Sequence, residues 1–228
     1  ASLLGSRSGE FRRQVEENTV KRSTLTRYAA EMEEAAALIQ GNITRASALV
    51  QAFKQVAVDN TAGERCTTAM AEFLRDVVAA QGTVLRKRGI AVRIECDESL
   101  TLDTYPTAIN QMLSHFIINS VVHGYPDDRS RGTITIGTAL REDGAIELVY
   151  ADDGIGIAPE NLPRIFEPFF TTRRNQGSVG LGLNIVYNLV TSQLGGSISV
   201  SSVPDGGARF IIALPAVTPH LLSESLRN

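Results

Sequence analysis

The sequence has no tryptophan, two cysteines, and aromatic residues at only 6% of its 228 positions. Cys66 and Cys96 form neither a CxxC pair nor a dense disulfide pattern, which favours a reducing compartment and argues against a zinc site. The 22 basic and 25 acidic residues nearly cancel, so the charge balance excludes a protein built to coat nucleic acid or an anionic membrane. No apolar run approaches the roughly 18 to 20 residues that span a bilayer, so we expect no membrane segment in this chain.

Glycine and proline are scarce in the first quarter of the chain. Between Glu10 and Ala62 there is one glycine and no proline, which predicts helix. From residue 25 to 57 apolar residues recur at steps that alternate between four and three, which is a heptad seam. The seam consists of Leu25, Ala29, Met32, Ala36, Ile39, Ile43, Ala46, Val50, Phe53 and Ala57.

A helix from about residue 24 to 58 cannot bury such a seam by itself. Either it packs on the core of its own domain, or it forms a bundle with the preceding helix and a second subunit. The length and the unbroken period favour the bundle. We therefore assign residues 1–62 to a helical hairpin whose first helix is truncated and which dimerises as a four-helix bundle.

Residues 63–217 are predicted to form a second domain of mixed structure, followed by a C-terminal tail, 218–228. Helical spacing runs from Met70 to a basic end at Arg86, and Pro106 can open a helix that reaches about residue 124. Alternating apolar and polar residues predict the strands, at residues 90–96, 132–140, 145–151, 197–203 and 208–214. A further helix is expected at about 181–193. Helices interspersed with strands joined mostly by hairpins predict an α+β fold, a two-layer α/β sandwich.

Four segments of this domain carry residues suited to chemistry. The strand at 145–151 runs into Asp152–Ile157, an acid followed by two glycines, although such pairs also form ordinary turns. Gly177–Leu183 is a glycine-rich stretch that feeds a helix, where backbone N–H groups can hold phosphate. Between them, Phe166–Phe170 is an aromatic cluster that could equally be core. On the helix 106–124, the polar residues His115, Asn119 and His123 follow one another at intervals of four and can face one cavity.

The order of these segments resembles the catalytic ATP-binding domain of sensor histidine kinases, in the gyrase, chaperone, histidine kinase and MutL superfamily with its Bergerat-type fold. Asn119 and its helix look like the N box, and Asp152 to Gly156 matches DxGxG. Phe166 to Phe170 matches FEPFF, and Gly180 to Leu183 matches the end of GxGLGL. The resemblance covers about residues 64–216, and the heptad region is similar to the family's dimerisation and phosphotransfer hairpin.

The resemblance implies a role for each matching residue. Asp152 would accept a hydrogen bond from the adenine amino group, and Asn119 would coordinate Mg²⁺ bridging the phosphates. Phe166 to Val179 would form a mobile lid. The candidate catalytic residues are His115, Arg173 and Arg174, of which either arginine could equally be a solvated lid residue. The candidate nucleotide-binding residues are Asn119, His123, Asp152, Gly154, Gly156, Ile157, Phe166, Phe170, Thr172, Gly177, Gly180, Leu181, Gly182 and Leu183, with Asn119 also the candidate metal ligand.

Some positions depart from the family pattern. His115 stands where this family often has asparagine and where the hydrolytic relatives have the glutamate that activates water. A lysine often found after the N-box asparagine is Val122 here, Ser178 stands where the first glycine of GxGLGL is expected, and Ala208 replaces a threonine often seen near the adenine. Each departure puts one nucleotide contact in doubt.

The resemblance implies a cytoplasmic catalytic fragment of a dimeric sensor histidine kinase, which uses ATP and Mg²⁺ and has a response-regulator receiver domain as its partner. The γ-phosphoryl group would pass to a histidine and then to an aspartate of the regulator. Because the only histidines are His115, His123 and His220, we expect the acceptor to lie upstream of Ala1. The alternatives are an ATP-hydrolysing dimer clamp and a degenerate kinase that acts as a scaffold.

Overall fold

The computed structural model describes residues 2–17, 19–57, 63–126, 131–173 and 178–219, and it divides into two units. The first contains Ala1–Lys54, and we call it the hairpin unit. The second contains Gln55–Arg174 and Ser178–Asn228, and we call it the sandwich unit. No helix within the described ranges is both long enough and apolar enough to cross a membrane.

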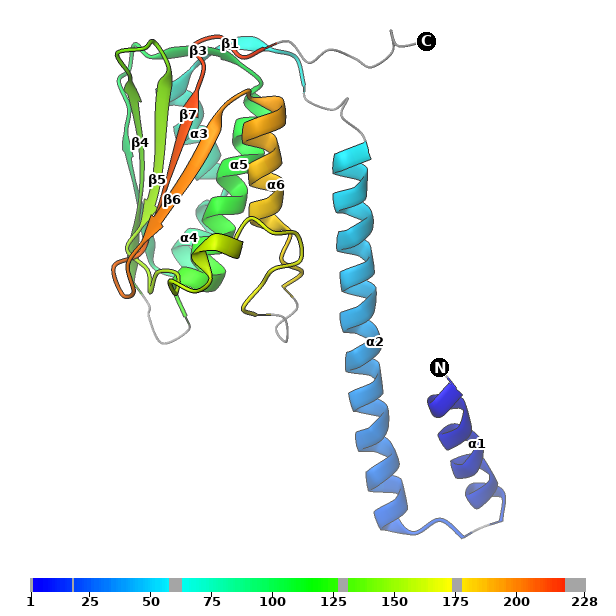
Figure 1. Cartoon of the computed structure of the whole chain (residues 1–228). Coiled ribbons are helices and arrows are strands. Elements are labelled where there is room, and N and C mark those ends of the chain that lie inside the picture. Colours follow the sequence, from blue (N-terminus) through cyan, green and yellow to red (C-terminus); the bar gives the residue numbers. More distant parts are fainter. Residues whose placement is uncertain (1, 18, 58–62, 127–130, 174–177, 220–228) are drawn as a thin grey trace, which may run out of the picture. The chain divides into compact units, whose positions relative to one another are not determined.

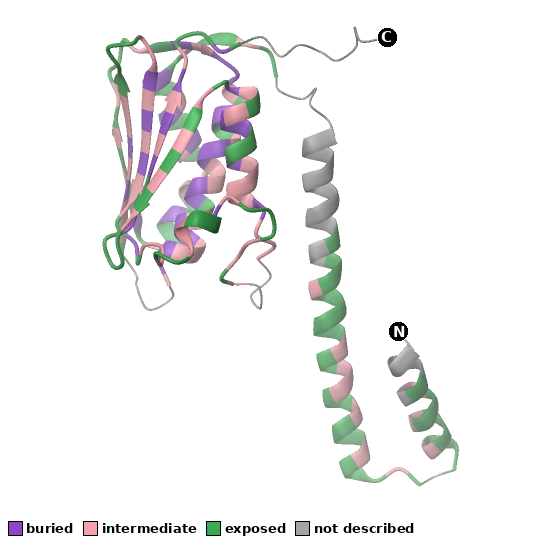
Figure 2. Ribbon diagram, viewed as in Figure 1, coloured by how far each residue is buried: buried purple, intermediate pink, exposed green. Residues whose placement is uncertain are grey.

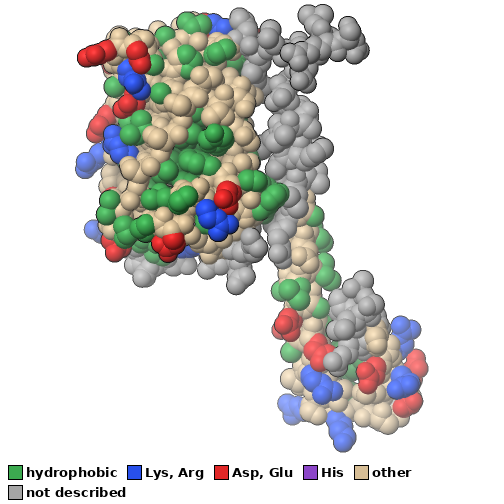
Figure 3. All heavy atoms as spheres, viewed as in Figure 1, with side chains coloured by type: hydrophobic (Ala, Val, Ile, Leu, Met, Phe, Trp, Pro, Cys, Tyr) green, Lys and Arg blue, Asp and Glu red, His purple; other side chains and the backbone are tan. Residues whose placement is uncertain are grey.

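The hairpin unit contains α1 (Ser2–Glu16) and all but the last three residues of α2 (Arg22–Ala57). The ring of Phe11 on α1 stacks on that of Tyr28 on α2, with centroids 4.1 Å apart and planes inclined by 5°. Because α1 has 15 residues and α2 has 36, α1 cannot cover the whole of α2. The seam residues Leu25, Ile39 and Ile43 are 53%, 49% and 64% exposed in the single chain. Much of α2 is exposed (Figure 2), and hydrophobic side chains lie on its surface (Figure 3).

The sandwich unit is built on a five-stranded sheet with the order β2-β4-β5-β7-β6 (Figure 1). The strands are β2 (Ile90–Glu95), β4 (Gly132–Leu140), β5 (Ile146–Asp152), β6 (Ser197–Ser202) and β7 (Ala208–Leu214). β2 and β4 are parallel, and every other neighbouring pair is antiparallel. The central pairing of β5 with β7 joins segments that lie about 60 residues apart in the chain.

Helices cover one face of this sheet (Figure 1). They are α3 (Met70–Ala80), α4 (Gly82–Lys87), α5 (Pro106–Asn119) and α6 (Gly182–Asn188). Alternate residues of β7, among them Phe210 and Ile212, are buried toward the helices, and Met112 and Phe116 of α5 are buried against them. Each such side chain contributes about 1.5–3 kcal/mol. The prediction of a two-layer α/β sandwich is confirmed, and Figure 2 shows the buried residues between the layers.

Two helices change their winding before they end. The sequence predicts one helix over 106–124, but from Ser120 to Gly124 the backbone forms a π-helical turn, in which the N–H of Tyr125 donates to the carbonyl of Ser120 at 3.0 Å. The expected helix at 181–193 likewise ends in a π-helical turn, Leu189–Gln193. A π turn holds one extra residue, so it changes the direction of the side chains on it, and such turns are frequent at functional sites.

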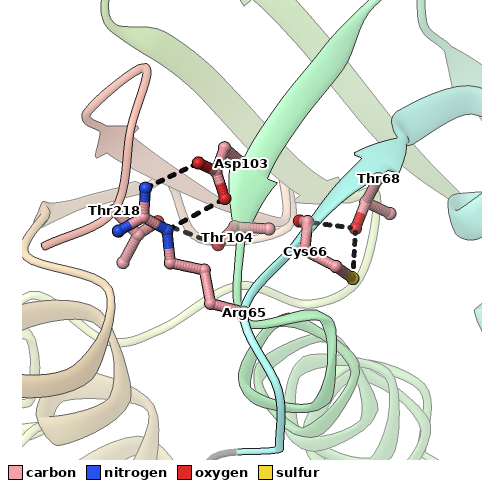
Figure 4. Close-up of polar contacts among 6 residues, drawn as sticks. All are labelled: Arg65, Cys66, Thr68, Asp103, Thr104 and Thr218. Atoms are coloured by element: carbon pink, nitrogen blue, oxygen red, sulfur yellow. Dashed lines mark hydrogen bonds and ion pairs between the residues drawn. The ribbon is translucent and has the colours of Figure 1, made fainter. Parts of the chain in front are cut away.

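A second, two-stranded sheet pairs β1 (Cys66–Ala69) with β3 (Thr101–Thr104), which the sequence did not predict. The guanidinium group of Arg65 donates to both carboxylate oxygens of Asp103, at 2.9 and 2.6 Å (Figure 4). The N–H of Thr218 donates to the Asp103 carbonyl at 2.9 Å, and its hydroxyl donates to that of Thr104 at 3.0 Å. We call these four residues the β3 clasp. Thr218, which the sequence assigned to the tail, is therefore fully buried in the sandwich unit.

Candidate nucleotide-binding site

A cavity of about 330 Å³ opens in the sandwich unit between the end of α5, the loop after β5 and the start of α6. Eleven of the residues that the motifs predicted line it. They are Asn119, His123, Asp152, Gly156, Ile157, Phe170, Thr172, Arg173, Gly180, Gly182 and Leu183. Segments from four separate motifs therefore meet at one hollow.

The other candidate residues lie elsewhere. His115, Gly154, Phe166 and Leu181 belong to the same elements but are not among the lining residues. The Nδ1 of His115 lies 3.6 Å from the position that a Cβ of Gly182 would occupy, so this imidazole packs beneath the glycine loop. Arg174 and Gly177 fall outside the described residues.

Asp152, the last residue of β5, has its carboxylate fixed by three donors. Its Oδ1 accepts the N–H of Gly154 at 3.0 Å and that of Ala208 at 3.3 Å. Its Oδ2 accepts the hydroxyl of Ser120 at 2.6 Å. These donors come from the β5 loop, from β7 and from the π turn after α5, so three separate parts of the fold hold one carboxylate at the cavity wall.

Two glycines let the backbone approach where a side chain would clash. Gly207 has φ +82°, and a Cβ on it would lie 1.7 Å from the carbonyl oxygen of Asp152. Gly180 has φ +73°, and a Cβ there would lie 2.4 Å from the carbonyl oxygen of Phe170. Both residues combine a left-handed backbone with missing space, so only glycine fits. Gly207 lets the chain before β7 pass close to the Asp152 backbone. Gly180 lets the loop before α6 pass close to the Phe170 backbone.

Asn119, the last residue of α5 before the π turn, is the residue predicted to bind a metal ion. Its Nδ2 is buried and has no hydrogen-bond partner among the described residues, while its Oδ1 lies 3.5 Å from the position of a Gly182 Cβ. An amide oxygen is a hard ligand that suits Mg²⁺, which retains waters and takes substrate phosphates. In the described ranges no three His, Cys, Asp or Glu side chains cluster as a self-sufficient metal site. The residues present therefore fit an ion that arrives with phosphates.

The charged groups of the cavity are of opposite sign. Asp152 supplies a carboxylate, and among the described lining residues Arg173 alone carries a permanent positive charge. Burial lowers the pKa of His123, and the charge of Arg173 lowers it further. Burial also lowers the pKa of His115. Both shifts favour the neutral imidazole, and Arg173 is the cationic side chain of the described cavity wall that can attract an anionic phosphate.

The segment predicted to be a lid is attached at several described points. The guanidinium carbon of Arg164 lies 4.6 Å from the ring centre of Phe170, and the amide of Asn184 donates to the carbonyl of Phe166 at 2.9 Å. The hydroxyl of Thr171 donates to that of Ser178 at 3.1 Å. These contacts hold the described parts of the segment, and its mobility stays a prediction.

Half of the residues that line the cavity were not predicted individually, although three of them lie inside predicted motif or lid segments, namely Ile155, Thr171 and Ser178. The residues not named are Phe116, Ser120, Gly124, Ile155, Ala158, Asn161, Ile165, Thr171, Ser178, Ala208 and Phe210. In the sequence, Ala208 and Ser178 stand out only as departures from the family pattern, at positions where threonine and glycine are expected. The hydroxyl of Ser120, directly after Asn119, was the signal that could have been used.

The layered fold, the carboxylate after β5 and the glycine loop before α6 together define an ATP-binding domain of the sensor histidine kinase type. The family described as histidine kinase-, DNA gyrase B-, and HSP90-like ATPase matches residues 104–218, half of the chain, and the chain belongs to this family.

Individual relatives agree with this assignment. The chain is 34% identical over 134 residues to the two-component sensor PprA of Pseudomonas aeruginosa, a match that covers 57% of this chain and 14% of PprA. It is 34% identical over 133 residues to the sensor histidine kinase ZraS of Salmonella typhi, covering 58% of this chain and 27% of ZraS. The catalytic domain of histidine kinase ThkA superposes with a TM-score of 0.58 at 27% identity, over 68% of this chain and 97% of that domain. The chain thus spans a small part of the curated relatives it matches.

Proposed function

We propose that this chain is the catalytic part of a dimeric sensor histidine kinase, which transfers the γ-phosphoryl group of Mg-ATP to a histidine for relay to a response-regulator aspartate. The observation that carries the proposal is the cavity shared by Asp152, whose carboxylate is held by three donors, and Asn119, whose buried amide nitrogen has no partner among the described residues. The carboxylate is suited to a base, and the amide can donate to a phosphate through its nitrogen and bind a metal ion through its oxygen. Because ATP and receiver domains are cytoplasmic, the proposal places the chain there.

The cavity residues bind and orient the reactants. Asp152 accepts a hydrogen bond from the amino group of the adenine, and the backbone at Gly180 and Gly182 approaches the phosphates. Arg173 offers positive charge to the γ-phosphate. Asn119 would hold a magnesium ion, which would supply positive charge to the phosphates. The bond from the γ-phosphorus to the β–γ bridging oxygen breaks, a bond to the imidazole nitrogen forms, and ADP leaves. Catalysis of this type depends mainly on positioning and charge stabilisation.

An ATP-hydrolysing clamp is the second candidate, and it requires a base that activates water. The hydrolytic relatives carry that base where this chain has His115, which is absent from the described cavity wall. We therefore expect slow ATP turnover. The kinase assignment is tested by incubating the chain with γ-labelled ATP and a separate protein that carries an acceptor hairpin with its histidine. Acid-labile, base-stable label on the acceptor is expected, and little on this chain, since residues 1–62 contain no histidine.

Asn119→Ala is expected to weaken Mg-ATP binding roughly tenfold and adenosine binding less than about twofold, because its oxygen serves the ion and not the base. Calorimetry with both ligands measures the two losses. Asn110→Ala is the matched control, since Asn110 is exposed on the same helix. Equal losses for both ligands would mean that Asn119 only supports the helix.

The hairpin unit supports the dimeric part of the proposal. Seam residues that are about half exposed in one chain represent apolar area that a second copy can cover. The seam keeps a heptad spacing, which is the spacing that packs helices side by side. We propose that two copies pair through α2 and α1 as a four-helix bundle.

Replacing Ile39 and Ile43 together by glutamate is expected to convert the dimer to monomers, because charges buried in the seam cost several kcal/mol. Sedimentation measures the mass, and calorimetry should show that the sandwich unit still binds nucleotide. Ala30→Glu with Ala37→Glu is the control, since both residues are exposed on α2 outside the seam. A wild-type chain that remains monomeric at high micromolar concentration would contradict the bundle.

A further inference from the structure

Behind Asp152 lies a chain of hydroxyl groups that the kinase chemistry does not use. The hydroxyl of Tyr150 lies 2.9 Å from the Oγ of Ser120, which in turn lies 2.6 Å from the Oδ2 of Asp152. Tyr150 is fully buried, and Ser120 is 5% exposed. Phenylalanine in place of Tyr150 and alanine in place of Ser120 would fill nearly the same space, so the two hydroxyls must be explained by the bonds they make.

The direction of these hydrogen bonds follows from counting protons. A carboxylate can only accept, so the single hydroxyl proton of Ser120 points to Asp152. The Oγ of Ser120 therefore accepts the proton of Tyr150. Burial raises the pKa of Tyr150 well above its ordinary value, so the phenol remains a donor. The bonds run in one direction, from Tyr150 through Ser120 to Asp152.

The same count shows what Asp152 presents to the cavity. A carboxylate has about four acceptor positions. Two on Oδ1 are taken by the N–H groups of Gly154 and Ala208, and one on Oδ2 is taken by Ser120. One acceptor position remains, on Oδ2, and there is no donor. A base with an amino group at this place can donate a hydrogen bond to the free position. A base with a carbonyl oxygen there sets one acceptor against another, and no hydrogen bond forms.

We propose that Tyr150 and Ser120 are positioning residues that fix Asp152 with one outward acceptor, and that they thereby select purine nucleotides with a 6-amino group over those with a 6-oxo group. This inference rests on the proposed function, in which Asp152 receives the base. Its new content is that the selectivity comes from two buried hydroxyls and not from the carboxylate alone.

The surrounding packing makes the relay rigid. The ring of Tyr150 stacks on Phe116 with centroids 5.0 Å apart, and Phe116 contacts Phe210 at 4.6 Å. Phe116 and Phe210 also line the cavity. Ser120 is the first residue of the π turn, which aims its hydroxyl at β5 while Asn119 stays beside Gly182. The aromatic cluster therefore fixes the Tyr150 ring, and the π turn fixes the Ser120 hydroxyl.

The test is calorimetry of the full chain with Mg-ATP and with Mg-ITP, which differ in the 6-position of the base. Ser120→Ala is expected to weaken ATP roughly tenfold and to change ITP less than about twofold, so the preference for ATP falls roughly tenfold. Ser120→Thr, which keeps the hydroxyl, should restore the preference. Tyr150→Phe should lower it by about threefold, because Ser120 then still donates but is no longer held from behind.

Non-additivity separates a relay from two independent effects. Because Tyr150 acts through Ser120, the double variant should match Ser120→Ala alone. Ser114→Ala and Tyr125→Phe are matched controls and should leave the preference unchanged. Ser114 lies on the same helix, Tyr125 is a buried tyrosine whose hydroxyl donates to Asp153 at 2.9 Å, and both are absent from the described cavity wall.

Three results would overturn the relay. Equal losses of ATP and ITP would show that the hydroxyls only stabilise the fold, and additive losses in the double variant would show that Tyr150 does not act through Ser120. If Ser120→Ala did not fold, Tyr150→Phe would serve alone. An unchanged preference for ATP in that variant would show that Tyr150 does not position Asp152. A wild-type chain that binds neither nucleotide would overturn the proposed function itself, which is a distinguishable outcome.

Discussion

Asp152→Asn is expected to nearly abolish ATP binding at micromolar concentration while leaving the fold intact. The substituted amide keeps the shape of the side chain but offers a donor where the adenine amino group needs an acceptor. A hydrogen bond to a charged group is worth roughly 1.5–3 kcal/mol, which corresponds to about 10- to 150-fold in affinity. Calorimetry with Mg-ATP measures the loss.

Asp153→Asn is the matched control for this experiment. The carboxylate of Asp153 accepts the hydroxyl of Tyr125 and the N–H of Thr133, and the residue is not among the described lining residues of the cavity. An amide oxygen can accept both bonds, so affinity should remain near that of the wild type. Unchanged ATP affinity in Asp152→Asn would refute the assignment of Asp152 as the base anchor.

Gly207→Ala is expected to destabilise the sandwich unit by about 2–5 kcal/mol and to remove ATP binding with it. The left-handed backbone costs roughly 1–2 kcal/mol for any other residue, and displacing the Asp152 carbonyl from the path of the new Cβ adds about 1–3 kcal/mol. Since whole domains are stable by only about 5–15 kcal/mol, the effect is large. Urea unfolding followed by tyrosine near-ultraviolet circular dichroism reports on this unit, which holds four of the five tyrosines.

Gly144→Ala separates the two causes. Gly144 has φ +83°, almost the same as Gly207, but nothing lies within 4 Å of the position that its Cβ would take. This variant should therefore lose only the roughly 1–2 kcal/mol of the backbone preference and should bind ATP normally. Equal destabilisation by both variants would show that the contact with Asp152 is unimportant.

The regular parts of the fold could be predicted because their burial is periodic. The predicted strands 132–140 and 208–214 have the bounds of β4 and β7, since alternate side chains there face a single core. The strands β1 and β3, which form the separate two-stranded sheet, were missed because four residues each are too few to show an apolar alternation. The predicted helix that begins at Met70 is divided at Gln81, where φ and ψ are −90° and 2°, between α3 and α4.

The site could be predicted where its residues are contiguous in the chain. Asp152 and the glycines belong to short motifs, whereas Phe210 reaches the cavity only because β7 pairs with β5 and sets it opposite Tyr150. Ser120 reaches Asp152 only from a π turn, and helical periodicity assumes an α-helix. The missed contacts thus depend on long-range pairing and on a local departure from regular winding. The roles of the individual residues stay predictions.

The β3 clasp has a consequence for how the sandwich unit can be combined with other modules. Arg65, near the start of the described residues of the unit, and Thr218, near their end, both bond to the single residue Asp103. The two ends of the described part of the unit are therefore neighbours, as in domains that tolerate insertion into longer proteins. A force applied to either end would act first on β3, because both ends are bonded to Asp103 on that strand. Loss of the contacts at one end, by force or by proteolysis, would therefore weaken the attachment of the other end.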